Sequence, residues 1–381
     1  VFDHKLMSRE DVNDLEERGA SVFCGSPVVP KDDFDLCVVS PGFPTSSDVI
    51  SDIISAGAEV ISELELGYRN CKCPILGITG SKGKSTMVRL CADAFNLLGM
   101  RVEPAGNYGV ALCDVARRSD ELDWVVVEAS SFQLELVKDF SPRVGVILNL
   151  QPDHLDRHGS MDEYCRIKTR LIANAGNKDK SSVGIILDRD SKRISGIMGR
   201  NDWIKFGISS SALYRYEDGR IVPGKAVEGR GGRRDFSVNL NGTLFDNKIL
   251  GLTAAATVAA LDVCGVDVSG VEKAASEFKP LPHRMNSVLT VKGVEFVDDS
   301  KATSLTALNA ALEMSGKPVL LVAGGILKED DLKIVKEMLS KKVKKVYLIG
   351  SAQKNMLEEW SEVVRCYPCG RLDEAVNMAW A

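Results

Sequence analysis

The fold of this chain is decided by residues 75–86, which read Ile-Leu-Gly-Ile-Thr-Gly-Ser-Lys-Gly-Lys-Ser-Thr. The apolar run from Ile75 to Ile78 predicts a buried strand, and a glycine-rich turn then leads into a helical pattern from Lys84 to Leu98. The backbone amides of such a turn and the positive end of the helix dipole both attract anions. The stretch therefore predicts a strand–loop–helix unit that holds the phosphates of a nucleotide.

Within this loop, the residue types suit a nucleotide that is bound together with a divalent cation. Lys84 would reach the β- and γ-phosphates, and the hydroxyl of Ser85 or Thr86 would bind Mg²⁺. Lys82 adds a second positive charge. The standard pattern has a glycine where Ile78 stands, so a chance Gly-Lys-Ser turn is the alternative interpretation. The candidate loop residues are Gly80, Ser81, Lys82, Gly83, Lys84, Ser85 and Thr86.

Strand-like and helix-like segments alternate along nearly the whole sequence. Predicted strands cover residues 36–40, 59–61, 75–78, 124–127, 144–148, 294–297, 319–322 and 345–349, and predicted helices cover 47–56, 84–98, 253–264 and 304–314. This alternation is typical of an α/β fold in which helices cover a mostly parallel sheet. Residues 214–247 are richer in Gly, Arg and Asn and predict hairpins and loops. Proline-containing breaks at 71–74 and 279–282 predict domains 1–73, 74–281 and 282–381.

Composition and charge exclude several classes of protein. Apolar residues make up 44% of the 381 residues, which is enough for several ordinary cores. A net charge of −5 disfavours sequence-independent binding to nucleic acid, which needs an excess of Lys and Arg. The longest apolar runs, such as 144–150, are far shorter than the ~20 residues that span a bilayer. We therefore expect neither nucleic-acid nor membrane partners.

The ten cysteines are scattered, and most of them lie in apolar surroundings. This pattern predicts reduced thiols in a cytoplasmic protein and not a disulfide framework. Cys366 and Cys369 have the spacing of a redox or zinc motif, but no second pair accompanies them. The sequence therefore favours an ordinary structural role for this pair.

Polar residues follow two of the predicted strands where ligands of open α/β sheets bind. Glu128 comes directly after strand 124–127 and is placed to hold a metal near the phosphates. A surface glutamate that caps a helix is the alternative. After strand 144–148, Asp153, His154 and Asp156 lie close together, which suggests a cation site.

His154 and His158 also have the spacing of a zinc-binding helix. However, Leu155 stands where a metalloprotease needs its glutamate base, so we do not expect that activity.

Several segments, in this order, resemble the Mur ligases. They are 80–86, Gly106–Gly109, Glu128–Glu135, Asn149–Asp156, Pro282–Arg284 and Asp299–Thr303. Phe132-Gln133 after the paired serines, and Asp-Ser-Lys-Ala-Thr at 299–303, are similar to the branch of the family that adds D-glutamate. The resemblance covers most of the chain, and the combination of motifs is specific although no single motif is.

The resemblance implies a three-domain α/β architecture. A central P-loop ATPase domain with a mostly parallel sheet would be flanked by Rossmann-like domains, the first binding the UDP-linked substrate and the last binding the amino acid and ATP. It also implies that ATP phosphorylates the carboxylate of UDP-N-acetylmuramoyl-L-alanine to an acyl phosphate, which the amine of D-glutamate attacks in peptidoglycan precursor synthesis. ATP and two Mg²⁺ ions are the implied cofactors. The implied protein is a monomer with these small molecules as partners.

The same resemblance implies roles for individual residues of the central domain. Lys84 would clamp the transferred phosphate, and Asn107 would orient the nucleotide-linked substrate. Lys168 matches a lysine that the family carbamylates; without the family it is simply a lysine of an amphipathic helix. The implied catalytic residues are Lys84, Asn107, Glu128, His154 and Lys168. The implied metal ligands are Ser85, Glu128, His154 and Lys168.

Further residues would contact the substrates and the far end of ATP. Ser130 and Gln133 would contact the substrate from the central domain. From the third domain, Arg284 and Asp299 would contact ATP. Residues facing the two carboxylates of D-glutamate would be Lys301, Thr303 and Lys328.

The chain departs from the family pattern in three places. Residues 249–253 lack the asparagines that serve the nucleotide, and the first strand and the C-terminal loop of the family are absent. We therefore expect a sequence clipped at both ends, with both Rossmann-like domains incomplete. The alternatives are a related Mur or folylpolyglutamate synthase-like ligase with another amino acid, and a non-catalytic nucleotide-binding homologue.

Overall fold

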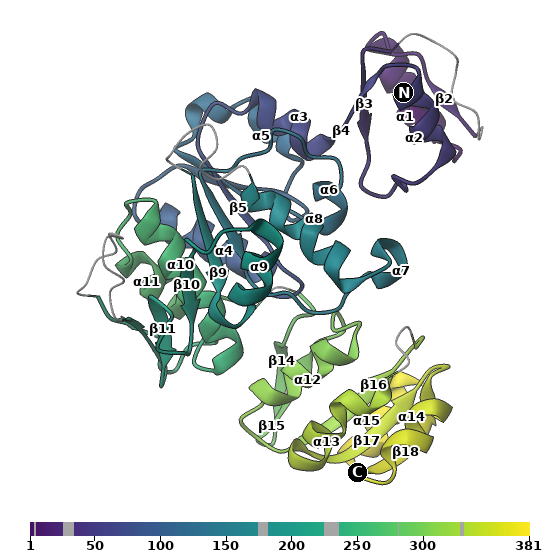
Figure 1. Cartoon of the computed structure of the whole chain (residues 1–381). Helices are drawn as coiled ribbons and strands as arrows, with labels where there is room; N and C mark the ends of the chain where they lie inside the picture. The colour runs from purple at the N-terminus through teal and green to yellow at the C-terminus, as the bar shows by residue number, and fades with distance from the viewer. Residues whose placement is uncertain (4, 26–33, 174–181, 225–235, 281, 328–330) are drawn as a thin grey trace. The chain divides into compact units, whose positions relative to one another are not determined.

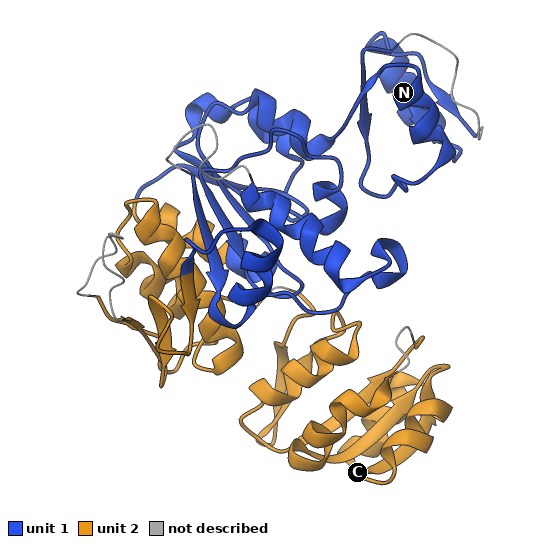
Figure 2. Ribbon diagram, in the orientation of Figure 1, with its two compact units in different colours: residues 1–88, 99–204 blue, residues 89–98, 205–381 orange. Residues whose placement is uncertain are grey.

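The computed structural model describes residues 1–3, 5–25, 34–173, 182–224, 236–280, 282–327 and 331–381. The chain divides into two compact units (Figure 2). Unit 1 comprises residues 1–88 and 99–204, and unit 2 comprises residues 89–98 and 205–381. Figure 1 labels many of the helices and strands of both units.

The N-terminal part of unit 1 alternates short strands and helices. Its elements are β1 (Phe2–Asp3), α1 (Arg9–Glu17), β2 (Phe23–Cys24), β3 (Leu36–Val39), α2 (Asp48–Ser55), β4 (Glu59–Ser62) and α3 (Glu63–Asn70). The strands pair in parallel, β1 with β2 and β3 with β4. Each helix begins at a serine whose hydroxyl accepts a backbone amide three residues on, at Ser8, Ser47 and Ser62.

Five parallel strands form the sheet of unit 1, in the order β9-β8-β5-β7-β6. They are β5 (Ile75–Thr79), β6 (Val102–Gly106), β7 (Trp124–Glu128), β8 (Val144–Ile147) and β9 (Val183–Leu187). Every residue of β5, β7 and β8 is buried, which explains their unbroken apolar sequences. Because all five strands run parallel, their carboxyl ends meet at one edge of the sheet.

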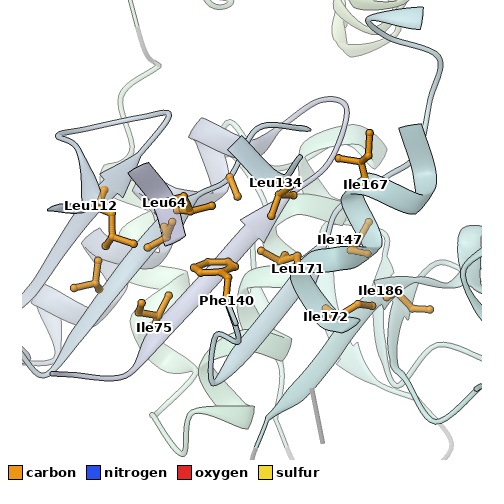
Figure 3. Close-up of a cluster of buried hydrophobic side chains, with 14 of the residues drawn as sticks. Leu64, Ile75, Leu112, Leu134, Phe140, Ile147, Ile167, Leu171, Ile172 and Ile186 are labelled. Atoms are coloured by element: carbon orange, nitrogen blue, oxygen red, sulfur yellow. The ribbon is translucent and has the colours of Figure 1, made fainter. Parts of the chain in front are cut away.

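Helices connect these strands, and α8 packs against β5 and β8. The helices are α4 (Lys84–Leu97), α5 (Leu112–Ala116), α6 (Ser131–Leu134), α7 (Leu155–His158), α8 (Met161–Ala173) and α9 (Ser191–Met198). Residues 84–88 of α4 belong to unit 1 and residues 89–97 to unit 2. Figure 3 shows Ile167, Leu171 and Ile172 of α8 among the strand residues Ile147 and Ile186, in one buried cluster. Burial of such side chains contributes about 1.5–3 kcal/mol each, so α8 is fixed firmly against the sheet.

The first part of unit 2 contains strands in the order β13-β12-β11-β10, followed by two helices. They are β10 (Ile204–Gly207), β11 (Tyr214–Glu217), β12 (Arg220–Pro223), β13 (Val238–Asn239), α10 (Lys248–Val263) and α11 (Ser269–Glu277). β11 and β12 form a hairpin through Asp218 and Gly219, which both have positive φ, as a two-residue hairpin turn requires. The hairpin expected within 214–247 is thus confirmed.

The second part of unit 2 has a hairpin and a three-stranded parallel sheet. The hairpin pairs β14 (Asn286–Val291) with β15 (Val294–Asp298). The sheet has the order β16 (Val319–Gly324), β17 (Val343–Ile349), β18 (Arg365–Gly370). Its helices are α12 (Leu305–Met314), α13 (Lys336–Lys342), α14 (Gln353–Trp360) and α15 (Leu372–Trp380). Trp360 is fully buried, and its indole N–H donates to the carbonyl of Leu332 at 2.9 Å.

The α/β class and the mostly parallel sheet of the central strands are confirmed. The predicted strands and helices all occur, although α10 begins at Lys248 and not at residue 253, because the side chain of Asn247 caps it by accepting the amides of Ile249 and Leu250. The domain limits at 73 and 281 remain predictions. All ten cysteines are free thiols. Across the described ranges, we find no helix with the length and apolar character that crossing a bilayer demands.

Candidate active site

The candidate residues of the predicted central domain gather at the edge of the unit 1 sheet where the strands have their carboxyl ends. The glycine-rich loop, residues 80–83, follows β5, Glu128 is the last residue of β7, and residues 149–154 follow β8. Because β5 lies between β7 and β8, these segments are neighbours in space.

The loop is anchored by the segment that follows β8. The amide of Lys82 donates to Asn149 Oδ1 at 2.9 Å, and Asn149 Nδ2 donates to the carbonyl of Lys82 at 3.0 Å. The hydroxyl of Ser81 donates to the carbonyl of Gln151 at 2.8 Å. The amide of Ser81 also donates to the carbonyl of Asn149 at 3.0 Å. These bonds hold the loop in place without any bound anion.

Two lysines direct their ammonium groups at the loop. Lys84 Nζ donates to the carbonyls of Gly80 and Ser81 at 2.9 and 3.1 Å. Lys168 Nζ, from α8, donates to the carbonyl of Gly80 at 3.0 Å and to Thr79 Oγ1 at 3.3 Å. The structure thus brings Lys84 and Lys168 onto the same turn of backbone.

Lys168 differs from an ordinary helix lysine because it is only 1% exposed. Burial, and then the neighbouring charge of Lys84, hold the pKa of Lys168 well below its usual range. Lys168 thus lies on an amphipathic helix, as the sequence predicts, but on the buried face of α8. The lowered pKa favours its neutral amine over the charged form more than in an exposed lysine.

Glu128 is buried in this edge of the sheet, with 1% of its surface exposed. Asn107 Nδ2 donates to its Oε1 at 2.7 Å, while Oε2 is buried with no hydrogen-bond partner in the described chain. Gly106 makes this approach possible, since its φ is +92° and a Cβ there would lie 2.3 Å from the carbonyl oxygen of Glu128. The alternative of a surface glutamate is thus wrong, and the orphaned oxygen fits a hard cation such as Mg²⁺.

His154 lies on the exposed side of the same edge. Its backbone has a left-handed φ of 54°, its side chain is 51% exposed, and its ring packs on that of Phe132 at 4.8 Å. It precedes α7, whereas His158 ends that helix and is buried, so the two do not form a zinc-binding helix. Nowhere in the described ranges do three or more His, Cys, Asp or Glu side chains gather for a metal.

A cation here would therefore take few protein ligands, as Mg²⁺ bound with nucleotide phosphates does. Ser85, which lies in the first turn of α4 and is half-buried, adds a neutral hydroxyl to this set.

Ser130 and Gln133 are engaged in capping α6. The hydroxyl of Ser130 accepts the amide of Gln133 at 3.2 Å, and Gln133 Oε1 accepts the amide of Ser130 at 3.0 Å. This reciprocal capping box fixes the turn that follows Glu128.

The sequence interpretation missed a buried polar network beside His154. His158 Nε2 lies 3.0 Å from Ser131 Oγ, and its Nδ1 lies 3.3 Å from Glu135 Oε1. Arg157 forms an ion pair with Glu135 at 2.7 Å and donates to the carbonyl of Phe43 at 3.1 Å. No sequence motif predicts this network, because its members come from segments that are far apart in the sequence.

Tyr164 is a second residue that was missed. Its hydroxyl lies 2.9 Å from Ser81 Oγ, and Lys168 Nζ lies 4.8 Å from its ring centre. The spacing of four residues between Tyr164 and Lys168 on an amphipathic helix would have predicted this shared face.

The candidate residues of the predicted third domain lie in unit 2. There, hydrogen bonds join the loop around residues 283–285 to the loop around residues 299–303. Asp299 Oδ1 accepts the amide of Met285 at 2.9 Å, beside Arg284, and partial burial raises the pKa of Asp299. The amide of Lys301 donates to the carbonyl of His283 at 3.0 Å. Arg284, Lys301 and Thr303 are exposed. Lys328 lies outside the described residues.

Comparison with known proteins identifies the family. Residues 78–247 match the Mur ligase middle domain. The chain is 33% identical over 353 residues to the UDP-N-acetylmuramoylalanine–D-glutamate ligase of Pelotomaculum thermopropionicum, covering 90% of this chain and 74% of that protein. It is 32% identical over 380 residues to the ligase of the same name from Acidobacterium capsulatum, and the match covers 97% of this chain and 80% of that protein.

Solved structures show the same fold at lower identity. A MurF ligase from Thermotoga maritima, in complex with ADP, superposes with a TM-score of 0.62 at 19% identity, covering 95% of this chain and 84% of that one. The UDP-N-acetylmuramate–alanine ligase MurC of the same organism superposes with a TM-score of 0.60 at 16% identity. The match covers 98% of this chain and 85% of MurC. With this fold, the anchored glycine-rich loop and these relatives, the chain belongs to the Mur ligase family, in the group of the UDP-N-acetylmuramoylalanine–D-glutamate ligases.

Proposed function

We propose that this protein uses ATP to join D-glutamate to UDP-N-acetylmuramoyl-L-alanine through an acyl phosphate, in the cytoplasmic synthesis of peptidoglycan precursors. The observation that carries the proposal is that Lys84 and Lys168 both bond to one anchored loop, at the strand edge where the orphaned Glu128 oxygen is buried. A carboxylate is a poor electrophile. ATP and the carboxylate are both anions, so they repel each other when they are brought together. A partly buried loop that carries Lys82 and Lys84 lowers the cost of that encounter.

Lys84 and the positive end of the helix that follows the loop would bind and neutralise the β- and γ-phosphates of ATP. Ser85, Glu128 and His154 would hold Mg²⁺, which neutralises charge on the phosphates when bound. The support for Glu128 is its buried oxygen without a partner. Asn107, which donates to the other oxygen of Glu128, would keep that carboxylate facing the cation and orient the UDP-linked substrate.

Lys168 would act as a carbamate, an anion that supports a second Mg²⁺. Carbamylation requires a neutral amine, and burial keeps the pKa of Lys168 well below its usual range. With labelled bicarbonate, a carbamate carbon signal is expected in the wild type by NMR and not in Lys168→Met. A signal of equal size in that variant would contradict this role.

Unit 2 would supply the groups for the second substrate and for the far side of ATP. Arg284 and Asp299 would contact ATP, and the exposed Lys301 and Thr303 would meet the carboxylates of D-glutamate. Lys328 is proposed for the same carboxylates from the family resemblance alone. Ser130 and Gln133 would contribute indirectly, since their capping box fixes the chain after Glu128.

The proposal is tested by measuring ADP release with each substrate omitted in turn. Release should require both UDP-N-acetylmuramoyl-L-alanine and D-glutamate. If L-glutamate or a diamino acid supports faster release than D-glutamate, the protein is a related ligase with another specificity. If no substrate combination releases ADP but the nucleotide still binds, the protein is a non-catalytic homologue.

A further inference from the structure

The segment Cys71-Lys72-Cys73-Pro74 joins α3 to β5 and carries two thiols side by side. The sulfur atoms of Cys71 and Cys73 lie 3.8 Å apart, and both side chains are half-buried. They pack at the margin of the hydrophobic cluster of unit 1. Neither residue belongs to the candidate active site, so the ligase reaction does not account for the pair.

The backbone that carries these thiols is held at several points. The amide of Lys72 donates at 2.9 Å to the hydroxyl of Ser119, which is fully buried and in turn donates to the carbonyl of Ala116. The carbonyl of Pro74 accepts the amide of Val125 at 3.1 Å. The two sulfurs are therefore kept together by the fold, and a reaction between them does not have to overcome chain entropy.

The two thiols are also chemically unequal. The side-chain hydrogen bond between the two thiols lowers the pKa of Cys71 to about 6 and, together with burial, raises the pKa of Cys73. Burial raises the pKa of Cys113, which is also half-buried, to about 12. The thiolate is the reactive form of cysteine, so Cys71 has the character of an attacking sulfur and Cys73 that of its resolving partner.

The CxxC pair of unit 2 lacks this arrangement. Cys366 and Cys369 lie on the single strand β18, and their sulfurs donate to the carbonyls of Val364 and Tyr367. Burial raises the pKa of both. Spacing in the sequence thus pointed to one cysteine pair, and proximity in the structure points to another.

We propose that Cys71 and Cys73 form a reactive dithiol that hydroperoxides oxidise to an intrachain disulfide, independently of the ligase reaction. The Cys71 thiolate attacks the peroxide, giving Cys71 sulfenic acid and releasing hydroxide. The Cys73 sulfur then attacks the sulfenic sulfur, the S–S bond forms and the second oxygen leaves as water. Two thiols lose two electrons and two protons, and the peroxide is reduced to water.

The test uses the wild-type protein and hydrogen peroxide. After alkylation of the remaining thiols and digestion with trypsin, which cuts after Lys72, peptides 70–72 and 73–82 should remain joined, or 70–82 should appear uncut and lighter by two hydrogen atoms. A thiol reductant should restore both free thiols. The thiol of Cys113 should stay alkylatable throughout. Loss of the Cys71 and Cys73 thiols without a link between them, or their full alkylation after peroxide, would overturn the proposal.

Two variants test the order of attack. In Cys73→Ser, oxidation should stop at the sulfenic acid of Cys71, which dimedone captures. In the matched control Cys113→Ser, the link between Cys71 and Cys73 should form as in the wild type. Before oxidation, iodoacetamide at neutral pH should modify Cys71 roughly tenfold faster than Cys113, because of its larger thiolate fraction. Equal rates, or no dimedone adduct on Cys71, would contradict its role as the attacking thiol.

Discussion

The edge of the sheet in unit 1 and the joined loops in unit 2 present their candidate residues in opposite ways. In unit 1, Glu128 and Lys168 are each 1% exposed, and the loop to which Lys168 donates is fixed by bonds to the chain after β8. In unit 2, Arg284, Lys301 and Thr303 are exposed, and the bonds between the two loops are made by backbone amides and a carboxylate. The difference suggests that unit 1 sets the chemistry and unit 2 recognises the incoming molecules.

The largest expected effect lies in the loop of unit 1. Lys84→Ala removes the charge nearest the phosphates and should lower ADP release by roughly 100- to 1,000-fold. Lys82→Ala is the matched control, because Lys82 is one-third exposed and is paired with Asp153 at 3.3 Å. The control should lose far less activity. Equal losses in the two variants would show that the loop needs only positive charge and not Lys84 itself.

A buried lysine gives the next largest effect and a pH signature. Lys168→Met should lower turnover by roughly 100-fold while keeping the fold, because a buried amine is replaced by an apolar chain of similar length. Lys192→Met, on the exposed side of α9, should leave turnover unchanged.

The pKa of Lys168 is lowered, so between that value and 10.5 the unfolded chain binds a proton that the folded chain does not. This group therefore makes the free energy of unfolding rise with pH across that window, and the slope should be smaller in Lys168→Met. Chemical denaturation at several pH values measures it, and an unchanged slope would contradict the burial of a neutral amine.

An exposed lysine in unit 2 should affect binding more than chemistry. Lys301→Ala should raise the KM for D-glutamate roughly tenfold with a small change in kcat, since it removes one charge-assisted contact to a carboxylate. Lys317→Ala, another exposed lysine of unit 2, is the control and should have the wild-type KM. A fall in kcat with KM unchanged would assign Lys301 to the chemistry and break the division between the units.

The smallest effect concerns the stability of the unit 2 loops in acid. The amide of Ser300 and then His283, which lies 2.7 Å away, lower the pKa of Asp298 to about 2. The stabilisation from this carboxylate is present above its usual pKa of 3.8 and is lost as the pH falls through about 2. Asp298→Asn should therefore unfold with a weaker pH dependence over this window. Asp373→Asn, on exposed α15, should follow the wild type, and identical curves for all three proteins would refute the assignment.

The sequence predicted the parts of the molecule that depend on local pattern. The strand and helix around the glycine-rich loop follow from apolar periodicity, and Glu128 follows from its position at a strand end. The network of His158, Ser131 and Glu135 could not be predicted, because burial and long-range contact create it. Residues 249–253 lack the asparagines of the family pattern, and Asn247, just before them, is the N-cap of α10 and is bonded to that helix.

The unpartnered oxygen of Glu128 links the stability of unit 1 to what it binds. A buried acceptor without a hydrogen bond costs about 1–3 kcal/mol, and that cost falls on the folded protein alone. A cation that satisfies the oxygen removes the penalty, so its binding and the folding equilibrium are thermodynamically coupled. Added Mg²⁺ should raise the Tm of the wild type and raise it less in Glu128→Gln, before any substrate is present.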